Sequence, residues 1–268
     1  MNRIEKKFSE LKRAKKKALV VFITAGDPSL AMNEALIPAL EREGVDVVEL
    51  GVPFSDPLAD GPVIQTSSQR ALARGVTLPK ILGLVRRVRP RTRLPLVLMS
   101  YLNPIWRLGV GRFAKAAKAA GVDGVIIPDL PPDEGREIAR AFKRESLDLV
   151  YLLAPTSPAS RQRMISQASQ GFIYFVSVTG VTGVRRSLSK QVLRQVAHLK
   201  KRTKLPVCVG FGVSTPEQAK QVARVADGVI VGSAVVKALA ARPALGAAAF
   251  AKRFIRPLAH ALGKASDG

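Results

Sequence analysis

Three carboxylates stand close together in residues 49–62, which read ELGVPFSDPLADGP. Glu49 ends the apolar run VDVVEL, and Asp56 and Asp60 follow in a segment too rich in Pro, Asp and Gly for a helix or a strand. A carboxyl group held in apolar surroundings exchanges protons near neutral pH, because desolvation raises its pKa. The segment therefore indicates acid–base chemistry, and a solvated carboxylate at a strand end is the alternative.

Two glycine-rich turns late in the chain, VGFGVSTPEQ and IVGSAVV, are suited to binding a phosphate group. Gly210, Gly212, Gly232 and Ser233 leave backbone N–H groups uncovered where helices are predicted to begin, and such groups bind anions. Tight turns without a ligand are the alternative. A third glycine-rich segment, SVTGVTGVRRSLSK, has the length and polarity of a flexible lid over a site or of an ordinary mobile loop.

Short apolar runs alternate with longer amphipathic ones along the chain, which predicts a repeated strand–helix unit. Their near-continuous Val, Leu and Ile content indicates strands buried on both faces of a parallel sheet. Eight units favour an α/β fold, a closed eight-stranded (β/α)8 TIM barrel. An open doubly wound sheet is the alternative, but the turn after the first strand, TAGDPSL, lacks the pattern Gly-x-Gly-x-x-Gly. The predicted strands are residues 19–24, 45–50, 94–101, 124–128, 147–154, 172–178, 207–211 and 229–232.

Segments outside these units extend the barrel at both ends. Residues 1–17 have apolar side chains at helical spacing, so we expect an extra N-terminal helix packed over one barrel mouth. Residues 235–262 predict one or two Ala-rich C-terminal helices interrupted at Pro243 and Gly246, and residues 263–268 predict a disordered tail. Neither addition resembles a second domain, so the whole chain is expected to be one TIM-barrel domain.

The composition suits one large core and carries an unusual charge. The chain has 268 residues, of which 47% are hydrophobic, and a formal net charge of +23. Such a charge suggests a polyanionic partner, but the basic residues are dispersed and no zinc-finger or RNA-recognition motif appears. Nucleic-acid binding is therefore expected to be at most weak and nonspecific. No signal peptide is apparent, and no apolar run reaches the about 20 residues that span a bilayer.

Several reactive residue types are expected to have no catalytic role. The single Cys208 lies in an apolar run and predicts a buried structural thiol in a reduced, cytoplasmic protein. His198 and His260 stand apart from other potential ligands, so no metal site is expected. Asp27, after the first predicted strand, is expected to cap the following helix or to order the turn.

Five motifs together resemble one enzyme family. The segments ITAGDP, ELGVPFSDPLADGP, GFIYFVSVTGVTG, VGFGV and VGSAVV occur in this order, and the chain resembles the alpha subunit of tryptophan synthase over nearly its whole length. The resemblance implies a lyase of tryptophan biosynthesis that cleaves indole-3-glycerol phosphate by a retro-aldol reaction to indole and glyceraldehyde 3-phosphate, without metal or cofactor. It also implies an α2β2 heterotetramer, in which a pyridoxal-phosphate beta subunit receives the indole.

The resemblance also assigns roles to individual residues. Glu49 would transfer the protons, Asp60 would accept a hydrogen bond from the indole N–H, and the Tyr174 hydroxyl would orient Glu49 or the glycerol chain. The resemblance implies an apolar indole pocket lined by Phe22, Met99, Tyr101 and Ile126. It implies a lid on which Thr182 closes toward Asp60. It implies phosphate contacts from Gly183, Phe211, Gly212, Gly232 and Ser233. The implied subunit-contact surface includes Pro53, Asp56, Pro57 and Asn103.

Two other functions stay open on the residues alone. One is another phosphate-sugar barrel, such as an epimerase or isomerase. The other is a barrel whose basic surface binds RNA or another polyanion.

Overall fold

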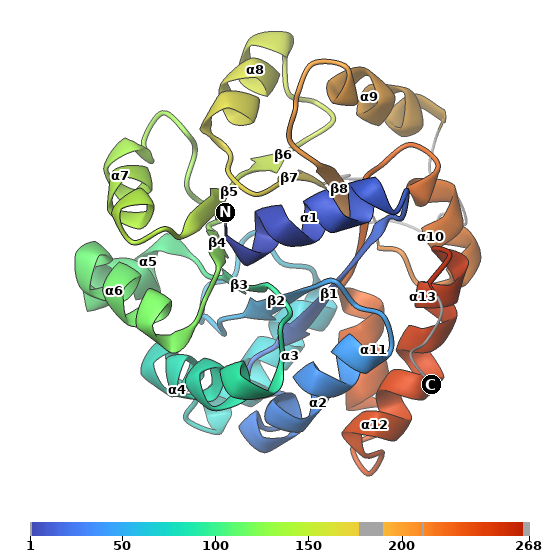
Figure 1. Ribbon diagram of the computed structural model, residues 1–268. Helices are drawn as coiled ribbons and strands as arrows, with labels where there is room; N and C mark the ends of the chain where they lie inside the picture. Colours follow the sequence, from blue (N-terminus) through green and yellow to red (C-terminus); the bar gives the residue numbers. More distant parts are fainter. Residues whose placement is uncertain (1, 177–189, 211, 265–268) are drawn as a thin grey trace.

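The computed structural model describes residues 2–176, 190–210 and 212–264. Within these residues all neighbouring strands pair in parallel, in the order β5-β4-β3-β2-β1-β9-β8-β7-β6. The helices surround this sheet, and α1 lies across one of its mouths (Figure 1). The strands are β1 Ala18–Thr24, β2 Val47–Gly51, β3 Leu96–Met99, β4 Gly124–Ile126, β5 Asp148–Val150, β6 Leu152–Leu153, β7 Ile173–Val176, β8 Val207–Gly210 and β9 Gly228–Val231.

The two ends of the sheet, β5 and β6, are pieces of one strand. Tyr151 alone separates them, and its carbonyl oxygen accepts a hydrogen bond from the Tyr174 N–H of β7 at 3.2 Å. The nine short strands therefore correspond to the eight predicted ones, with the predicted strand 147–154 divided in two. The predicted α/β fold with a parallel, eight-stranded TIM barrel is confirmed.

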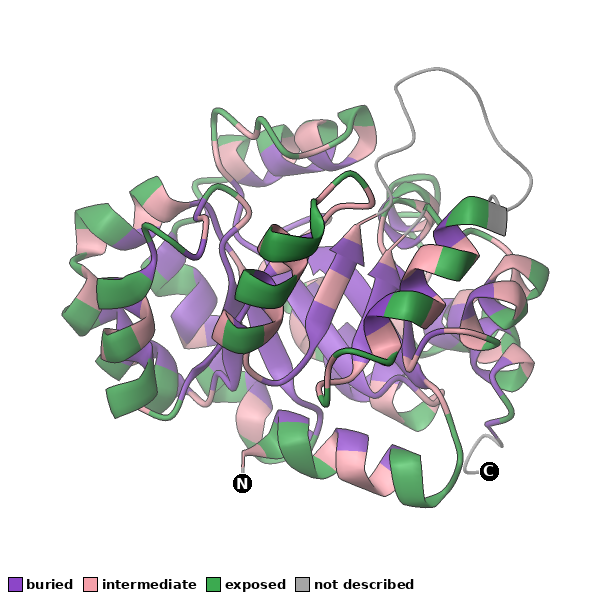
Figure 2. Ribbon diagram, turned by 90° about the horizontal axis from the view of Figure 1, so that it is seen from above, coloured by how far each residue is buried: buried purple, intermediate pink, exposed green. Residues whose placement is uncertain are grey.

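Helices connect successive strands and form the outer layer. Figure 2 shows buried residues along the strands and exposed residues on the outer faces of the helices. None of the helices in the described ranges is both long and apolar enough to cross a membrane. The helices are α1 Arg3–Arg13, α2 Leu30–Arg42, α3 Pro62–Ala73, α4 Leu78–Val88, α5 Leu102–Leu108, α6 Val110–Ala120, α7 Arg136–Arg144, α8 Ala159–Ala168, α9 Lys190–Lys200, α10 Pro216–Ala223, α11 Ser233–Ala240, α12 Ala247–Phe250 and α13 Arg256–Ala261, with a 3-10 turn at Arg89–Arg91 and a π-helical turn at Ala251–Ile255.

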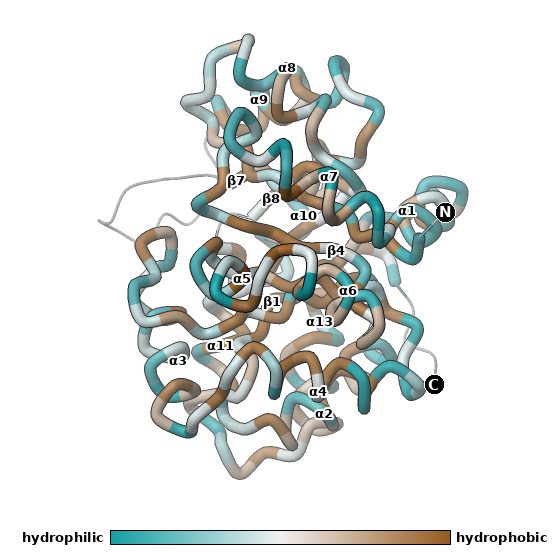
Figure 3. Tube along the Cα trace, turned by 90° about the vertical axis from the view of Figure 1, so that its left-hand side faces the viewer, coloured by the Kyte–Doolittle hydropathy of each residue, from teal (hydrophilic) through white to brown (hydrophobic). Residues whose placement is uncertain are grey.

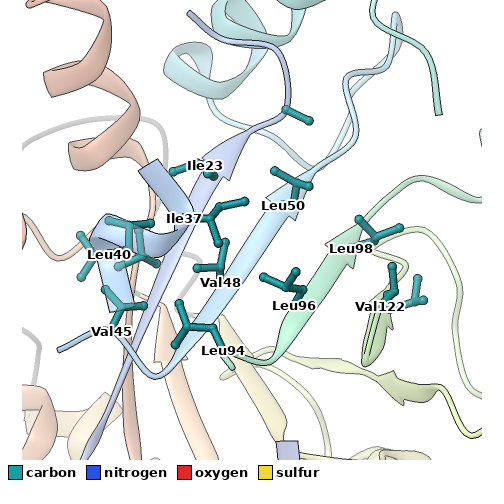
Figure 4. Packing of buried hydrophobic residues seen from close by; sticks show 14 of the residues in the cluster. Ile23, Ile37, Leu40, Val45, Val48, Leu50, Leu94, Leu96, Leu98 and Val122 are labelled. Atoms are coloured by element: carbon teal, nitrogen blue, oxygen red, sulfur yellow. The ribbon is translucent and has the colours of Figure 1, made fainter. Parts of the chain in front are cut away.

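Alternation along each strand divides the core into two parts. In β2, Val48 and Leu50 point outward and pack under the helices, whereas Val47 points into the barrel. Figure 4 shows Ile37 and Leu40 of α2 beside Val48 and Leu50. Hydrophobic segments gather along the strands (Figure 3). Burying one such leucine or isoleucine side chain contributes about 1.5–3 kcal/mol, so the outer layer holds the helices firmly against the sheet.

The extra N-terminal helix covers the mouth at which the strands begin. Asn2 caps α1, and Ile4, Phe8 and Leu11 form its buried face. The ring of Phe8 lies 5.7 Å from that of Phe172, just before β7. This confirms the predicted helix and places it at the end of the barrel opposite the carboxyl ends of the strands.

The C-terminal part of the chain is helical, with a break where the sequence predicts one. α11 ends at Ala240 and α12 begins at Ala247, so the chain leaves the helix around Pro243 and Gly246. The ordered chain extends farther than expected, because Lys264 is buried, contacts the Asp46 carboxylate and donates a hydrogen bond to the Gly44 carbonyl oxygen at 3.1 Å. Gly263 and Lys264, the first two residues of the predicted tail, therefore belong to the described chain, and residues 265–268 lie outside it.

Candidate active site

One ring of side chains points into the barrel near the carboxyl ends of the strands. Glu49 follows Val47 by two residues in β2, so it faces the interior as Val47 does. Phe22 of β1 and Tyr174 of β7 likewise lie two residues after an inward-pointing side chain of their own strand or its start, so they also point inward at this end of the barrel. Phe22 pairs in register with Glu49. The active-site end predicted from the sequence therefore holds the predicted carboxylate.

Glu49 is the most unusual carboxyl group of this ring. It is fully buried, and among the described residues neither of its carboxyl oxygens has a hydrogen-bond partner. Burial raises the pKa of Glu49 to about 8, because the surroundings disfavour the charged form. At pH 7 the side chain is therefore mostly protonated and able to donate a proton.

Asp60 lies in the loop between β2 and α3 and is held by Tyr101. Burial raises the pKa of Asp60 to about 6, while a hydrogen bond with the Tyr101 side chain acts in the opposite direction. The Tyr101 hydroxyl also accepts a hydrogen bond from the Ala59 N–H at 2.9 Å, and its ring lies 5.2 Å from that of Phe54. Tyr101, predicted to line the indole pocket, therefore also fixes the Asp60 loop. At pH 7 Asp60 is mostly ionised and can accept a hydrogen bond.

Tyr174 belongs to the same site. Desolvation, followed by the charges of Glu49, Cys208 and Asp60, raises its pKa well above the usual value. Its hydroxyl lies over Gly210, where an added Cβ would be only 2.7 Å away. The Glu49 oxygens accept no hydrogen bond from Tyr174 in the described structure, so the orienting role stays a prediction.

The predicted apolar lining is brought together around these groups. Phe22 packs with Ile64 and Val236, and Met99 borders this cluster as well as the barrel interior that contains the fully buried Ile126. The sequence prediction omitted Leu152, which also borders the interior cluster. Counting two residues on from Val150 along the strand would have found it.

A small residue is needed beside the Phe22 ring. A Cβ added at Gly51, the last residue of β2, would lie 2.4 Å from the tip of that ring. Gly51 therefore leaves the space that the aromatic side chain occupies. It stands in the predicted motif but was not among the predicted site residues.

The two glycine-rich turns are not equivalent. α11 begins directly after Gly232 without a side-chain cap, so its first N–H groups, beginning with Ser233, are available to an anion. The start of α10 is instead closed by a capping box, in which the Gln218 N–H donates to the Thr215 hydroxyl and the Thr215 N–H donates to the Gln218 side chain, both at 3.3 Å. Gly212 precedes that box with a φ of +64°. Of the predicted phosphate cradle, the described part with free N–H groups therefore consists of the start of α11 and Gly212.

Three predicted contact residues, Thr182, Gly183 and Phe211, lie outside the described residues. The same holds for the predicted lid, except for Lys190, at which α9 begins.

Three of the four residues predicted for subunit contact line one groove. Pro53, Asp56 and Asn103 line a hollow of about 480 Å³ between the loop after β2 and α5. Pro53 is itself buried, whereas Pro57 is half-buried outside the lining. The loop after β2 and α5 also expose two large apolar side chains, Leu58 at 95% and Trp106 at 64%.

One expected role of Asp27 is wrong. Ser29 caps α2, because its hydroxyl accepts the Met32 N–H at 3.0 Å. The buried Asp27 carboxylate instead accepts hydrogen bonds from the Ser67 hydroxyl at 2.7 Å and from Nε of Arg70 at 2.9 Å. It thereby ties the turn after β1 to α3, the helix that follows Asp60.

The cysteine and the two histidines lie in different surroundings. Cys208 is buried, and desolvation raises the pKa of its thiol well above the usual value, so the thiol is unreactive. His198 and His260 are exposed on α9 and α13. The described residues contain no group of three or more His, Cys, Asp or Glu side chains that could hold a metal ion.

Comparison with known proteins settles the family. A family model described as tryptophan synthase alpha chain matches residues 8–259. The chain belongs to the tryptophan synthase alpha chain family. The tryptophan synthase alpha chain of Geobacter sulfurreducens is 58% identical over 237 residues, which cover 88% of this chain and 90% of that protein. The corresponding protein of a Picosynechococcus species is 50% identical over 264 residues, which cover 98% of this chain and all of that protein.

Solved structures of this family share the fold. The crystal structure of tryptophan synthase subunit alpha from Legionella pneumophila superposes with a TM-score of 0.91 at 40% identity, over 98% of this chain and 99% of that one. A structure of Mycobacterium tuberculosis tryptophan synthase gives a TM-score of 0.89 at 36% identity, with the same coverage. The predicted family is confirmed. The chain is a lyase of tryptophan biosynthesis, and its activity is the alpha reaction, the cleavage of indole-3-glycerol phosphate.

Proposed function

We propose that Glu49 and Asp60 carry the proton and charge chemistry of the alpha reaction in this chain. The observation that carries this proposal is the fully buried Glu49 carboxyl, which has no hydrogen-bond partner in the described structure and a pKa raised to about 8. Structural carboxylates in protein interiors are normally paired, because an unpaired buried charge is costly. A lone carboxyl that keeps its proton at neutral pH is suited to a reaction instead.

One carboxyl group suffices for both proton transfers. Protonated Glu49 donates its proton to carbon 3 of the indole ring, which makes the ring cationic. The resulting carboxylate then takes the proton of the hydroxyl group next to that carbon. The carbon–carbon bond breaks, its electron pair returns to the ring, and the O–H electron pair forms the carbonyl of glyceraldehyde 3-phosphate. Glu49 ends protonated, and indole leaves uncharged.

Asp60 and the lining complete the proposed site. The ionised Asp60 accepts a hydrogen bond from the indole N–H and stabilises the positive charge on the ring. The apolar ring rests against Phe22, Met99, Tyr101 and Ile126, while Tyr174 orders the glycerol chain. The phosphate binds at the N-terminal end of α11. The proposed phosphate and lid contacts are Gly232, Ser233, Gly212, Thr182, Gly183 and Phe211, the last three by their match to the family motifs.

The decisive variant is Glu49→Gln, which keeps the size of the side chain and removes its acid. We expect indole release to fall at least about 10³-fold, because general acid–base catalysis contributes about 10² to 10⁴-fold and both transfers use this group. Binding of glyceraldehyde 3-phosphate, measured by calorimetry, should stay within about twofold of the unaltered chain.

The matched control is Asp148→Asn. Asp148 is also a buried carboxyl, whose pKa burial raises to about 6, but it lies at the start of β5, at the opposite end of the barrel. Full indole release is expected in this variant. Normal turnover in Glu49→Gln, or an equal loss in Asp148→Asn, would reject the assignment.

We further propose that the chain works in the cytoplasm as the alpha subunit of an α2β2 complex, and that the beta subunit docks on the groove at Asp56 and Asn103. Exposed Leu58 and Trp106 support this surface, because large apolar side chains left in water mark interfaces and aromatic ones often anchor them. Trp106→Ala should weaken binding of the same organism's beta subunit by about 30-fold or more, as expected for an interface hot spot. Met164→Ala, which trims an apolar side chain exposed at 41% on α8, is the control and should leave that affinity unchanged.

A further inference from the structure

The barrel mouth opposite Glu49 carries a basic cavity that the alpha reaction does not use. The cavity measures about 660 Å³ and lies between the C-terminal end of α1, the start of β1 and the segment that joins α9 to β8. Figure 1 shows α1 crossing this mouth. Six lysines line the cavity: Lys12, Lys15, Lys16, Lys17, Lys200 and Lys204.

Among the described residues that line the cavity, these lysines face a single carboxylate. Asp227 lies in the same wall, but its Oδ1 accepts a hydrogen bond from Lys200 Nζ at 2.7 Å and its Oδ2 accepts one from the Val207 N–H at 3.0 Å. In residues 2–176, 190–210 and 212–264, the other five lysines form no ion pair. Six lysines against one aspartate leave the cavity with an excess of five positive charges.

The cavity combines an apolar floor with lysines of which four, Lys12, Lys15, Lys16 and Lys204, are exposed. Phe8 and Leu11 are buried in its lining, and Lys17 is half-buried beside them. Burial and then the nearby Lys200 lower the pKa of Lys17. Ammonium groups gathered at one mouth of the barrel repel one another, so an anion that binds among them relieves this repulsion.

The backbone at Lys15 does not favour lysine. After α1, the Lys15 N–H donates to the Lys12 carbonyl oxygen at 3.1 Å and the Lys16 N–H donates to that of Leu11 at 2.9 Å. This Schellman pattern places Lys15 where glycine is usual, and its φ of +54° is strained for a residue with a side chain. A lysine at this position adds charge to the cavity in spite of its backbone.

We propose that this basic cavity binds a compact anion that carries several phosphoryl groups. Its volume falls within the about 300–1,000 Å³ typical of small-molecule sites, and ammonium groups bind phosphoryl oxygens as point charges. Of the lining residues that the structure describes, Phe8 is the one aromatic residue and it is buried, so its ring is not exposed for stacking on a nucleobase. Val47, Val97 and Phe172 fill the barrel between the cavity and Glu49, which makes the cavity a separate site.

The proposal is tested with tripolyphosphate and the intact chain. Calorimetry is performed with saturating glyceraldehyde 3-phosphate, which occupies the phosphate cradle of the active site. We expect one saturable site whose Kd rises about tenfold or more in Lys15→Gly/Lys16→Gln/Lys204→Gln, because three charge-assisted contacts are lost. Protection of the lining lysines from acetylation by tripolyphosphate, read by mass spectrometry, should locate the site.

The control variant removes the same charge from elsewhere. Lys115→Gln/Lys143→Gln/Lys220→Gln changes exposed lysines on α6, α7 and α10, so its Kd should match that of the unaltered chain. Both triple variants should release indole at the normal rate. Equal weakening in the two variants, or no binding once glyceraldehyde 3-phosphate is present, would overturn the proposal. An RNA oligonucleotide that displaces tripolyphosphate and binds more tightly would overturn it too, in favour of a nucleic-acid surface.

Discussion

Replacement of Glu49 by glutamine should make the protein more stable in neutral and alkaline solution than the unaltered chain. The pKa of Glu49 is raised from 4.5 to about 8 in the folded protein. Between these two pH values the folded state keeps a proton that the unfolded state has lost. The free energy of unfolding therefore falls as pH rises, by about 1.4 kcal/mol per pH unit.

The structure sets the size of this effect. From pH 5 to pH 8 the Glu49 contribution to the free energy of unfolding should fall by about 3–4 kcal/mol, and it levels off above the folded pKa. Glutamine cannot ionise, so the variant lacks this loss. Asp60 and Asp148, whose pKa values burial raises to about 6, titrate in both proteins and cancel in the difference.

The assay is urea unfolding of both proteins at pH 5, 6, 7 and 8, followed by far-UV circular dichroism. The difference in unfolding free energy between the variant and the unaltered chain should grow by about 3–4 kcal/mol over this range. Asp148→Asn serves as the comparison, because its pH-dependent gain should end near pH 6. Parallel pH curves for Glu49→Gln and the unaltered chain would mean that Glu49 is ionised at neutral pH, and its role as the first proton donor would fail.

Three further predictions follow from the same site and from α1. The pH profile of kcat/KM should be bell-shaped, with limbs near pH 6 and 8, because the reaction needs Asp60 ionised and Glu49 protonated in the free enzyme; a profile flat from pH 5 to 9 would contradict this assignment. Gly51→Ala should raise KM about tenfold or more, because its Cβ would fall 2.4 Å from the Phe22 ring; unchanged steady-state kinetics would show that the ring moves at no cost. Lys15→Gly should raise the free energy of unfolding by about 0.5–1 kcal/mol in urea titrations, because glycine accepts positive φ; a loss of stability would show that the lysine side chain supports the fold.

The fold was accessible from the sequence because its signals are local and repeated. Each strand is a short run of Val, Leu and Ile, and the period-2 alternation that separates Val47 and Glu49 from Val48 and Leu50 operates within a few residues. The break of the fifth predicted strand at Tyr151 was not accessible, because it depends on the geometry of pairing with two different neighbours, β4 and β7. The same limit explains Lys264, whose burial depends on Asp46 and Gly44, far away in the chain.

The site was predictable where a motif carries it and unpredictable where partners come from distant segments. Glu49 and Asp60 lie in one block of sequence, so both could be named. Asp27 is of a residue type that often caps helices, but its carboxylate accepts hydrogen bonds from Ser67 and Arg70 of α3. The spacing of Thr215 and Gln218 is that of a capping box, so the closed start of α10 could have been predicted, whereas the glycine content alone does not separate it from the open start of α11 after Gly232.

The placement of Tyr101 joins the catalytic loop to the proposed docking groove. Tyr101 directly precedes α5, the helix that exposes Trp106, and its hydroxyl holds the Ala59 N–H at 2.9 Å, next to Asp60. The groove lies between the loop after β2 and α5. A partner bound in it therefore contacts both of the elements that the Tyr101 hydroxyl connects. Because the Tyr101 side chain also acts on the pKa of Asp60, a shift of either wall would change the charge of Asp60, the group that we propose faces the indole ring. Tyr101→Phe should accordingly reduce the increase in indole release that the beta subunit produces more than it reduces the rate of the isolated chain. Equal reductions would place the tyrosine in the indole pocket alone.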